Sequence, residues 1–280
     1  MESVAVGISR LIEQTLEVRG VCPECNGALY GWKTKNKDGS DRCAPTCMVC
    51  GYYALKLKVD ADTNKRYETS LKKKNHDLFK YRSVITDYAL FDKSLDNYQT
   101  KEEETAVAMT YAVDFIKEVL NGNPTHMILS GKSGVGKSHL CMAVCWAILQ
   151  ESQYSKKVLF VNYRELLERR KASFNDQSES KNQIALLQDI KTVDFVVIDD
   201  LGAELGGNNI KDSTSFNNDI LYSILEARQN KALMVNTNLT SDEIKKAYGE
   251  RILSRILKNS KQHSIQFART TDKRIRGVDQ

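Results

Sequence analysis

Residues 131–138 have the types and spacing that suit binding of a polyphosphate. Their sequence, GKSGVGKS, fits the pattern G-x-x-x-x-G-K-[S/T]. Backbone N–H groups of such a loop donate to phosphate oxygens, while Lys137 can reach the β- and γ-phosphates and Ser138 can bind Mg²⁺. An apolar run precedes the loop and a helix-like segment follows it, which favours a nucleotide-binding loop over an ordinary turn. The expected contact residues are Gly131, Lys132, Ser133, Gly134, Val135, Gly136, Lys137 and Ser138.

A second motif, Phe195 to Asp200 (FVVIDD), supplies carboxylates for the same chemistry. Four apolar residues followed by acids indicate a buried strand whose end carries Asp199 and Asp200. Asp199 would hold Mg²⁺ directly or through water, and Asp200 would orient or deprotonate an attacking water. Such a run is common alone, but after a phosphate-binding loop at this spacing it indicates hydrolysis of ATP.

The N-terminal region contains two C-x-x-C pairs separated by 21 residues. Four thiolates from two such turns complete a closed tetrahedral site, which predicts a structural zinc ion. Cys43 is expected to be a free thiol, with a role as substitute ligand left open, and the remaining Cys141 and Cys145 are expected to be buried and inert. The predicted zinc ligands are Cys22, Cys25, Cys47 and Cys50.

Aromatic and basic residues alternate around these pairs, a composition that suits stacking on single-stranded bases. In so small a module the aromatic residues can equally form the core, and docking of a protein remains the other possible role. The residues concerned are Tyr30, Trp32, Lys33, Lys35, Lys37, Tyr52 and Tyr53.

The rest of the chain alternates short apolar runs with helix-like stretches, which predicts an α/β fold with a parallel sheet. Strands are expected at 126–130, 158–162, 195–199 and 232–236, helices at 137–150 and 163–170, and a loop at 174–181.

Three regions are expected: a zinc-binding domain at 1–58, a lysine-rich connector at 59–85 and an ATPase domain at 86–280. The last is long enough to bury its own core, so a fragment beginning near Tyr81 should fold and bind ATP.

Charge and hydropathy exclude a membrane-spanning protein. The longest apolar runs, such as 140–149, are much shorter than the ~20 residues that cross a bilayer. The first 16 residues lack the continuous apolar stretch of a secretory signal, so a cytoplasmic location is expected. A net charge of +5 permits nucleic acid as a partner without requiring it.

Further short motifs accompany the phosphate-binding loop in a characteristic order: FDKSLDNY at 91–98, IDDLGAE at 198–204, VNTNL at 235–239 and GERILSRI at 249–256. Over residues 85–280 the chain resembles AAA+ ATPases of the DnaC/DnaI helicase-loader type and the related IstB-type transposition ATPases.

The resemblance implies roles for further residues. Asn238 would be the sensor 1 residue that positions water near the γ-phosphate. Arg255 would be an arginine finger that reaches the nucleotide of a neighbouring subunit, with Arg251 as the alternative. Arg274 would be the sensor 2 residue.

The implied function is ATP-dependent loading of a hexameric replicative DNA helicase onto single-stranded DNA, by a protein that assembles with its own copies. The short Asp200, where many AAA+ proteins have Glu, suggests slow, switch-like hydrolysis. DnaI-like loaders also have a zinc-binding N-terminal domain, although its equivalence here is by position and not by motif. Alternatives are a transposition-helper ATPase and a non-catalytic adaptor or inhibitor of the helicase.

Overall fold

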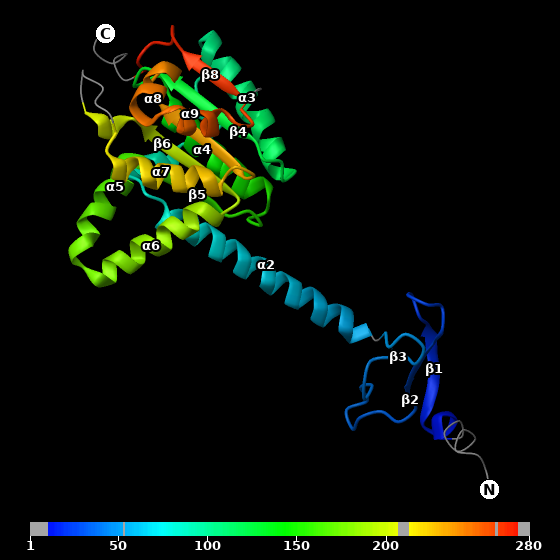
Figure 1. Cartoon of the computed structure of the whole chain (residues 1–280). Helices are drawn as coiled ribbons and strands as arrows, with labels where there is room; N and C mark the ends of the chain where they lie inside the picture. Colours follow the sequence, from blue (N-terminus) through cyan, green and yellow to red (C-terminus); the bar gives the residue numbers. More distant parts are fainter. Residues whose placement is uncertain (1–10, 53, 207–212, 261–262, 274–280) are drawn as a thin grey trace. The chain divides into compact units, whose positions relative to one another are not determined.

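The computed structural model describes residues 11–52, 54–206, 213–260 and 263–273 (Figure 1). The chain divides into two units, Met1–Ser70 and Leu71–Gln280. The boundary lies inside helix α2 (Ala54–Arg82), so the lysine-rich segment 59–85 is helical as far as Arg82.

The first unit is built on a small antiparallel sheet of three strands: β1 (Leu16–Val21), β2 (Ala28–Trp32) and β3 (Thr46–Cys47). One C-x-x-C turn connects β1 with β2, and the other begins at the end of β3. The sheet thereby places both cysteine turns at one edge.

The second unit contains a parallel sheet of five strands in the order β5-β6-β7-β4-β8. The predicted strands are all present, and a fifth, β8, pairs with β4 at the edge. Because the sheet is parallel, the residues that follow β4, β6 and β7 meet at one edge. The bounds are β4 (His126–Gly131), β5 (Val158–Asn162), β6 (Phe195–Leu201), β7 (Ala232–Thr237) and β8 (Ser264–Phe267).

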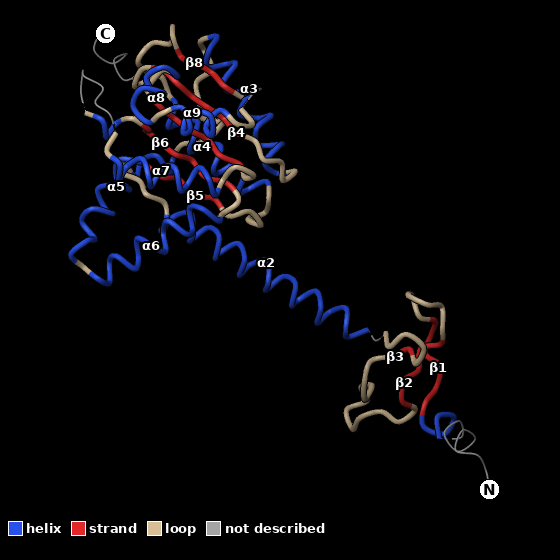
Figure 2. The backbone as a smooth tube through the Cα atoms, in the orientation of Figure 1, coloured by secondary structure: helices blue, strands red, loops and turns tan. Residues whose placement is uncertain are grey.

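Helices cover both faces of this sheet, which explains why its strands are almost continuously apolar (Figure 2). Met127 and Leu129 face a core formed with α3 (Glu103–Leu120) and α4 (Lys137–Glu151). Ile128, between them, faces a second core formed with the helices on the other side. These are α5 (Tyr163–Ala172), α6 (Gln177–Thr192), α7 (Ser215–Ala227), α8 (Ser241–Tyr248) and α9 (Glu250–Leu257).

The prediction of a loop at 174–181 is wrong, because only Asp176 in this range lies outside a helical element. A turn of 3-10 helix, η2 (Ser173–Asn175), is followed at once by α6. Asp176 caps α6 by accepting hydrogen bonds from the N–H groups of Ser178 and Glu179. A polar N-cap and a polar first turn resemble a loop in composition, so the helix start was missed.

Two further 3-10 turns lie in the described part of the second unit, η1 (Tyr88–Asp92) and η3 (Ala203–Leu205). The segment before η1 runs along β5, where the N–H of Val84 donates to Phe160 and the N–H of Asn162 donates to Val84. Among the described helices, none has the length and apolar character needed to cross a membrane.

Candidate active site

The phosphate-binding loop leads from β4 into α4 with the backbone shape that its glycines allow. Gly131, Gly134 and Gly136 have φ values of 133°, 85° and 98°, in the region that favours glycine. Gly136 is the N-cap of α4, and no side chain caps this helix within the part of the chain that the structure describes. The N-terminus of α4, with the positive end of its helix dipole, suits a phosphate at this position.

Lys137, the first residue of α4, lies nearly buried beneath the loop. Its Nζ donates to the carbonyl oxygens of Gly131 at 2.7 Å and Lys132 at 2.8 Å, and to Oδ1 of Asn238 at 2.8 Å. These bonds hold the ammonium group between the loop and the end of β7. Polyphosphate oxygens could accept from the same group.

Ser138 and Asp199 are directly connected at the end of β6. The Oγ of Ser138 donates to Oδ1 of Asp199 at 2.9 Å. Burial raises the pKa of Asp199 to about 6, although hydrogen bonds from Asn236 and Ser138 act in the opposite direction. Hard oxygen ligands of this kind suit Mg²⁺, so the residues fit the predicted metal.

Asn236 belongs to this cluster, although the sequence analysis did not select it. The buried Nδ2 of Asn236 donates to Oδ1 of Asp199 at 2.5 Å and to Oγ of Ser138 at 3.0 Å. The signal was present in VNTNL, because residues 236 and 238 point to the same side of an extended strand. Asn236 orients the serine and carboxylate, while Asn238 contacts Lys137.

Asp200 adopts an uncommon backbone conformation, with φ of 57°. The pairing of β6 with β7 shifts register between Ile198 and Leu201, and this irregularity lies at the two acids. The carboxylate of Asp200 receives a long hydrogen bond of 3.5 Å from Nδ2 of Asn238. Strained conformations of this kind are frequent at functional sites.

A cavity of about 400 Å³ connects these groups. Its walls come from the phosphate-binding loop, the ends of β5, β6 and β7, and a segment that consists of η1 and the residues next to it on both sides. That last contribution was not predicted, and it includes Thr86, Asp87, Leu90 and Lys93.

The FDKSLDNY segment is attached to α4 by two side chains. His139 contacts Ser94 O at 3.1 Å and Asn97 Oδ1 at 2.7 Å, and Trp146 donates to Phe91 O at 2.9 Å. This attachment places the segment beside the cavity.

The two arginine candidates lie on α9, away from the residues that line this cavity. The guanidinium of Arg255 donates to Glu226 at 2.6 Å and to Tyr222 at 2.9 Å. Arg251 is exposed, and its guanidinium has no hydrogen bond or ion pair with any described residue. Arg274 lies outside the described residues.

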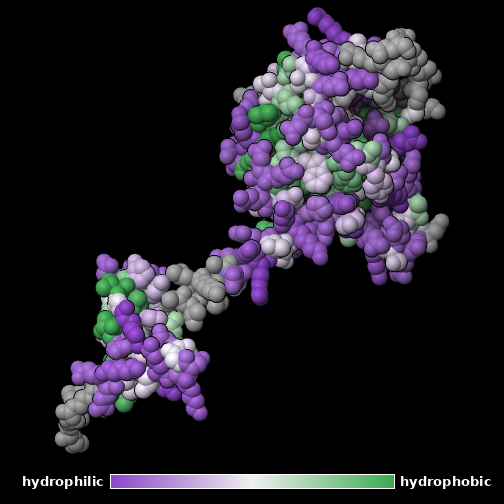
Figure 3. All heavy atoms as spheres, turned by 180° about the vertical axis from the view of Figure 1, so that it is seen from behind, coloured by the Kyte–Doolittle hydropathy of each residue, from purple (hydrophilic) through white to green (hydrophobic). Residues whose placement is uncertain are grey.

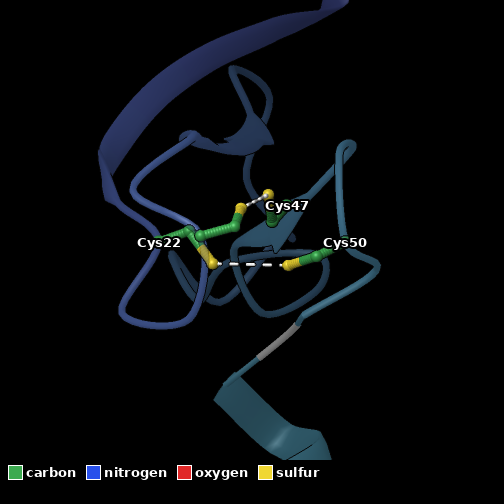
Figure 4. A group of neighbouring side chains, drawn as sticks. Cys22, Cys47 and Cys50 are labelled. Atoms are coloured by element: carbon green, nitrogen blue, oxygen red, sulfur yellow. Dashed lines mark hydrogen bonds between the residues drawn. The ribbon is translucent and has the colours of Figure 1, made fainter.

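The four predicted zinc ligands form a separate cluster in the first unit. Their Sγ atoms all lie within 4.8 Å of one another, and those of Cys22 and Cys50 are 3.5 Å apart. Figure 4 shows these two side chains facing each other. The N–H of Cys50 lowers the pKa of Cys47 to about 7, whereas burial and the neighbouring sulfurs outweigh the N–H of Tyr52 and raise the pKa of Cys50. Cys43 is exposed and does not belong to the cluster.

The cysteine turns use their glycines differently. Gly51 has φ of 75° in the second turn, whereas Asn26 takes the equivalent position in the first, with φ of 57°. A Cβ on Gly27 would lie 3.3 Å from Sγ of Cys25, so this glycine instead leaves space beside the sulfurs.

The other cysteines, Cys141 and Cys145, are buried in the α4 core, and burial raises the pKa of both thiols.

A parallel sheet in which β7 separates the phosphate-binding strand from the acidic strand, with this site at its edge, defines an ATP-binding P-loop protein of the AAA+ type. The sequence model of the family described as "IstB-like ATP binding protein" matches residues 60–276. The chain therefore belongs to the IstB-like ATP-binding protein family.

Similar proteins include helicase loaders. The chain is 29% identical over 167 residues to "Replicative helicase loader DnaC" of Escherichia coli (strain K12), with 58% of this chain and 62% of that protein covered. It is also 29% identical over 168 residues to "Uncharacterized protein YdaV" of the same strain, covering 59% and 62%. The chain thus spans somewhat less than two thirds of these relatives. The predicted resemblance to DnaC-type proteins is confirmed.

Solved structures show the same fold. A DnaI crystal structure has a TM-score of 0.55 at 23% identity, covering 66% of this chain and 95% of that chain. A structure of the DnaC helicase loader has a TM-score of 0.54 at 21% identity, covering 64% and 99%.

Proposed function

We propose that this protein is an ATPase that loads a replicative DNA helicase onto single-stranded DNA. The observation that carries the proposal is the network of Lys137, Ser138, Asp199 and Asn238 at the sheet edge. This network occurs in a chain that is similar to the replicative helicase loader DnaC.

The site supports transfer of the γ-phosphoryl group of ATP to water. Bound Mg²⁺ would neutralise phosphate charge, with Ser138 and Asp199 as its protein ligands. Lys137 would bind the β- and γ-phosphate oxygens, Asp200 would orient the attacking water or accept its proton, and Asn238 would position that water. The carboxylate of Asp200 is short and its backbone is already fixed at φ of 57°, so slow, switch-like turnover is expected.

Arginine from a neighbouring copy would complete this site. Arg255 is our first candidate for the finger, and Arg251 is the alternative. In the single chain Arg255 is occupied by Glu226 and Tyr222, so reaching a neighbour would require exchange of these contacts. Self-association through the ATPase domain would thereby be coupled to bound nucleotide.

A cluster between α5 and α7 suits single-stranded DNA. Phe174 is 58% exposed and makes an edge contact with Phe216, with 5.5 Å between ring centroids. Arg170 lies 5.5 Å from the centroid of Phe174, and Lys171 lies 6.0 Å from that of Phe216. Phe216 is half-buried, so Phe174 is the ring that can stack on a base while the adjacent cations contact phosphates.

The N-terminal unit would bind zinc through Cys22, Cys25, Cys47 and Cys50 and would dock on the helicase. Its surface carries exposed apolar side chains, visible as hydrophobic areas on this unit in Figure 3. Exposed apolar groups beside a rigid metal site suit a protein interface. They include Val18, Val21, Met48 and Val49.

The decisive experiment is helicase loading in a purified system. The full chain with ATP should place a hexameric helicase on circular single-stranded DNA, measured as unwinding of an annealed strand. Lys137→Ala should abolish ATP binding and loading, whereas Lys157→Ala, at the opposite edge of the sheet, should change neither. If the protein neither binds the helicase nor increases its loading onto single-stranded DNA, the proposal is wrong.

The family match also supports a second candidate, a transposition-helper ATPase. Such a protein would bind duplex DNA together with a transposase and would not retain a helicase. Co-purification with each partner, at matched salt, distinguishes the two functions.

A further inference from the structure

The segment after β8, residues 268–273, crosses from the sheet edge to the phosphate-binding loop and is called here the C-terminal strap. Glu104, in the first turn of α3, holds its first half. The carboxylate accepts hydrogen bonds from the N–H groups of Ala268, Arg269 and Thr270 at 2.9–3.1 Å. The hydroxyl of Thr270 adds a further bond of 2.6 Å.

Glu102 holds the next residue of the strap in the same way. Its carboxylate accepts from the N–H of Thr271 at 3.0 Å and from the Thr271 hydroxyl at 2.8 Å. Nζ of Lys273 then donates to the carbonyl of Gln99 at 2.8 Å. Partial burial acts to raise the pKa of Glu104, but the bonds from Thr270, Arg269 and Ala268 lower it overall, so the anion is favoured.

The strap lies directly against the phosphate-binding loop. The N–H of Lys273 donates to the carbonyl of Gly134 at 3.0 Å. A Cβ on Gly134 would lie 2.0 Å from Oδ1 of Asp272, and one on Gly131 would lie 2.5 Å from the carbonyl oxygen of Phe267. Both glycines therefore leave room for the C-terminal segment, in addition to adopting positive φ.

We infer that Glu104 and Glu102 are positioning residues for ATP: they hold the strap, and the strap holds the phosphate-binding loop in its binding shape. The inference rests on the proposed ATP site. If the phosphate-binding loop also adopts other conformations, its apparent affinity for ATP falls in proportion to the fraction of molecules in the binding conformation. Loss of the carboxylate of Glu104 or Glu102 should thus raise the dissociation constant for ATP without altering the reacting groups.

Glu103 provides a matched control, because it lies between the two residues on the same helix turn and is exposed. ATP affinity with Mg²⁺ is measured by calorimetry on the full chain. We expect Glu104→Gln to weaken binding by about tenfold, which corresponds to loss of charge-assisted hydrogen bonds. Glu103→Gln should match the wild type, and turnover at saturating ATP should stay close to wild type in both.

A double-mutant cycle tests whether Glu104 acts through the strap. Thr270→Val removes the hydroxyl donor, so its effect on ATP affinity should not add fully to that of Glu104→Gln. A lower unfolding temperature with unchanged ATP affinity would assign Glu104 a merely structural role and overturn the inference. If Glu104→Gln does not fold, Glu102→Gln decides by the same criteria. Failure of the wild type to bind ATP would overturn both the inference and the proposed function.

Discussion

The Oγ of Ser138 lies 2.9 Å from Oδ1 of Asp199, joining the end of the phosphate-binding loop to the end of β6. The two residues are 61 positions apart in the chain. Asp199 is 4% exposed, so its charge has little solvent to stabilise it when Mg²⁺ is not bound. The buried carboxylate of Asp199 therefore lowers the free energy of unfolding of the nucleotide-free protein.

Replacing Asp199 by Asn should stabilise the nucleotide-free protein at neutral pH. The folded pKa is about 6, against 3.8 in the reference state, so the folded protein binds more protons between these values. Its free energy of unfolding must then fall as pH rises from about 4 to 6. Asp199→Asn removes this penalty, which is on the order of 3 kcal/mol.

Urea unfolding of both proteins at pH 4 and pH 7.5 measures this effect. The variant should be the more stable protein at pH 7.5, and the difference should shrink at pH 4, while Mg²⁺-dependent hydrolysis is lost. A variant that is less stable than the wild type at pH 7.5 contradicts the argument.

The two arginine candidates make different predictions in mixed assemblies. Arg255→Ala should retain ATP binding but lose at least about 100-fold in turnover, since an arginine in trans contributes strongly to phosphoryl transfer. Adding a Lys137→Ala protein, which offers an intact arginine to the neighbouring site, should restore part of the activity. If Arg251→Ala shows this behaviour instead and Arg255→Ala does not, the finger is Arg251.

Zinc content tests the ligand assignment in the N-terminal unit. Metal analysis of the purified chain should give one zinc per protein, and Cys47→Ser should lose it because a buried sulfur of the four is removed. Cys43→Ser is the control and should keep the metal, because Cys43 lies outside the cluster. Loss of zinc in Cys43→Ser alone would mean that the ligands are wrongly assigned.

The features that the sequence could predict are those encoded in short motifs of consecutive residues. The phosphate-binding loop and the FVVIDD strand carry their function in consecutive residues, so both the α/β fold and these positions were predictable. Contacts between distant segments were not. Glu104 meets Thr270 across 166 positions, and nothing in either local sequence indicates the partner.

The same limit affects the choice of Tyr81 as the start of an ATPase fragment that folds by itself. A start near Tyr81 keeps all the nucleotide-site residues, but residues 71–80 contribute to the second unit. Phe79 is fully buried, with its ring centroid 4.8 Å from that of Trp146 and 5.6 Å from that of Phe91. Asn75 also donates to the carbonyl of Tyr154 at 2.7 Å. The many lysines of this helix indicated an exposed connector, so the packing of Phe79 and Asn75 against the second unit was not predicted.

A fragment 71–280 should consequently fold better than a fragment 81–280. Removing Phe79 leaves a cavity beside Trp146, and loss of a buried Phe side chain typically costs about 3–5 kcal/mol. The shorter fragment should unfold at a lower temperature, while 71–280 should bind ATP with the affinity of the full chain. Phe79→Ala in 71–280 is the matched control, and it should reproduce most of the loss. Equal unfolding temperatures for the two fragments would show that residues 71–80 do not stabilise the ATPase domain.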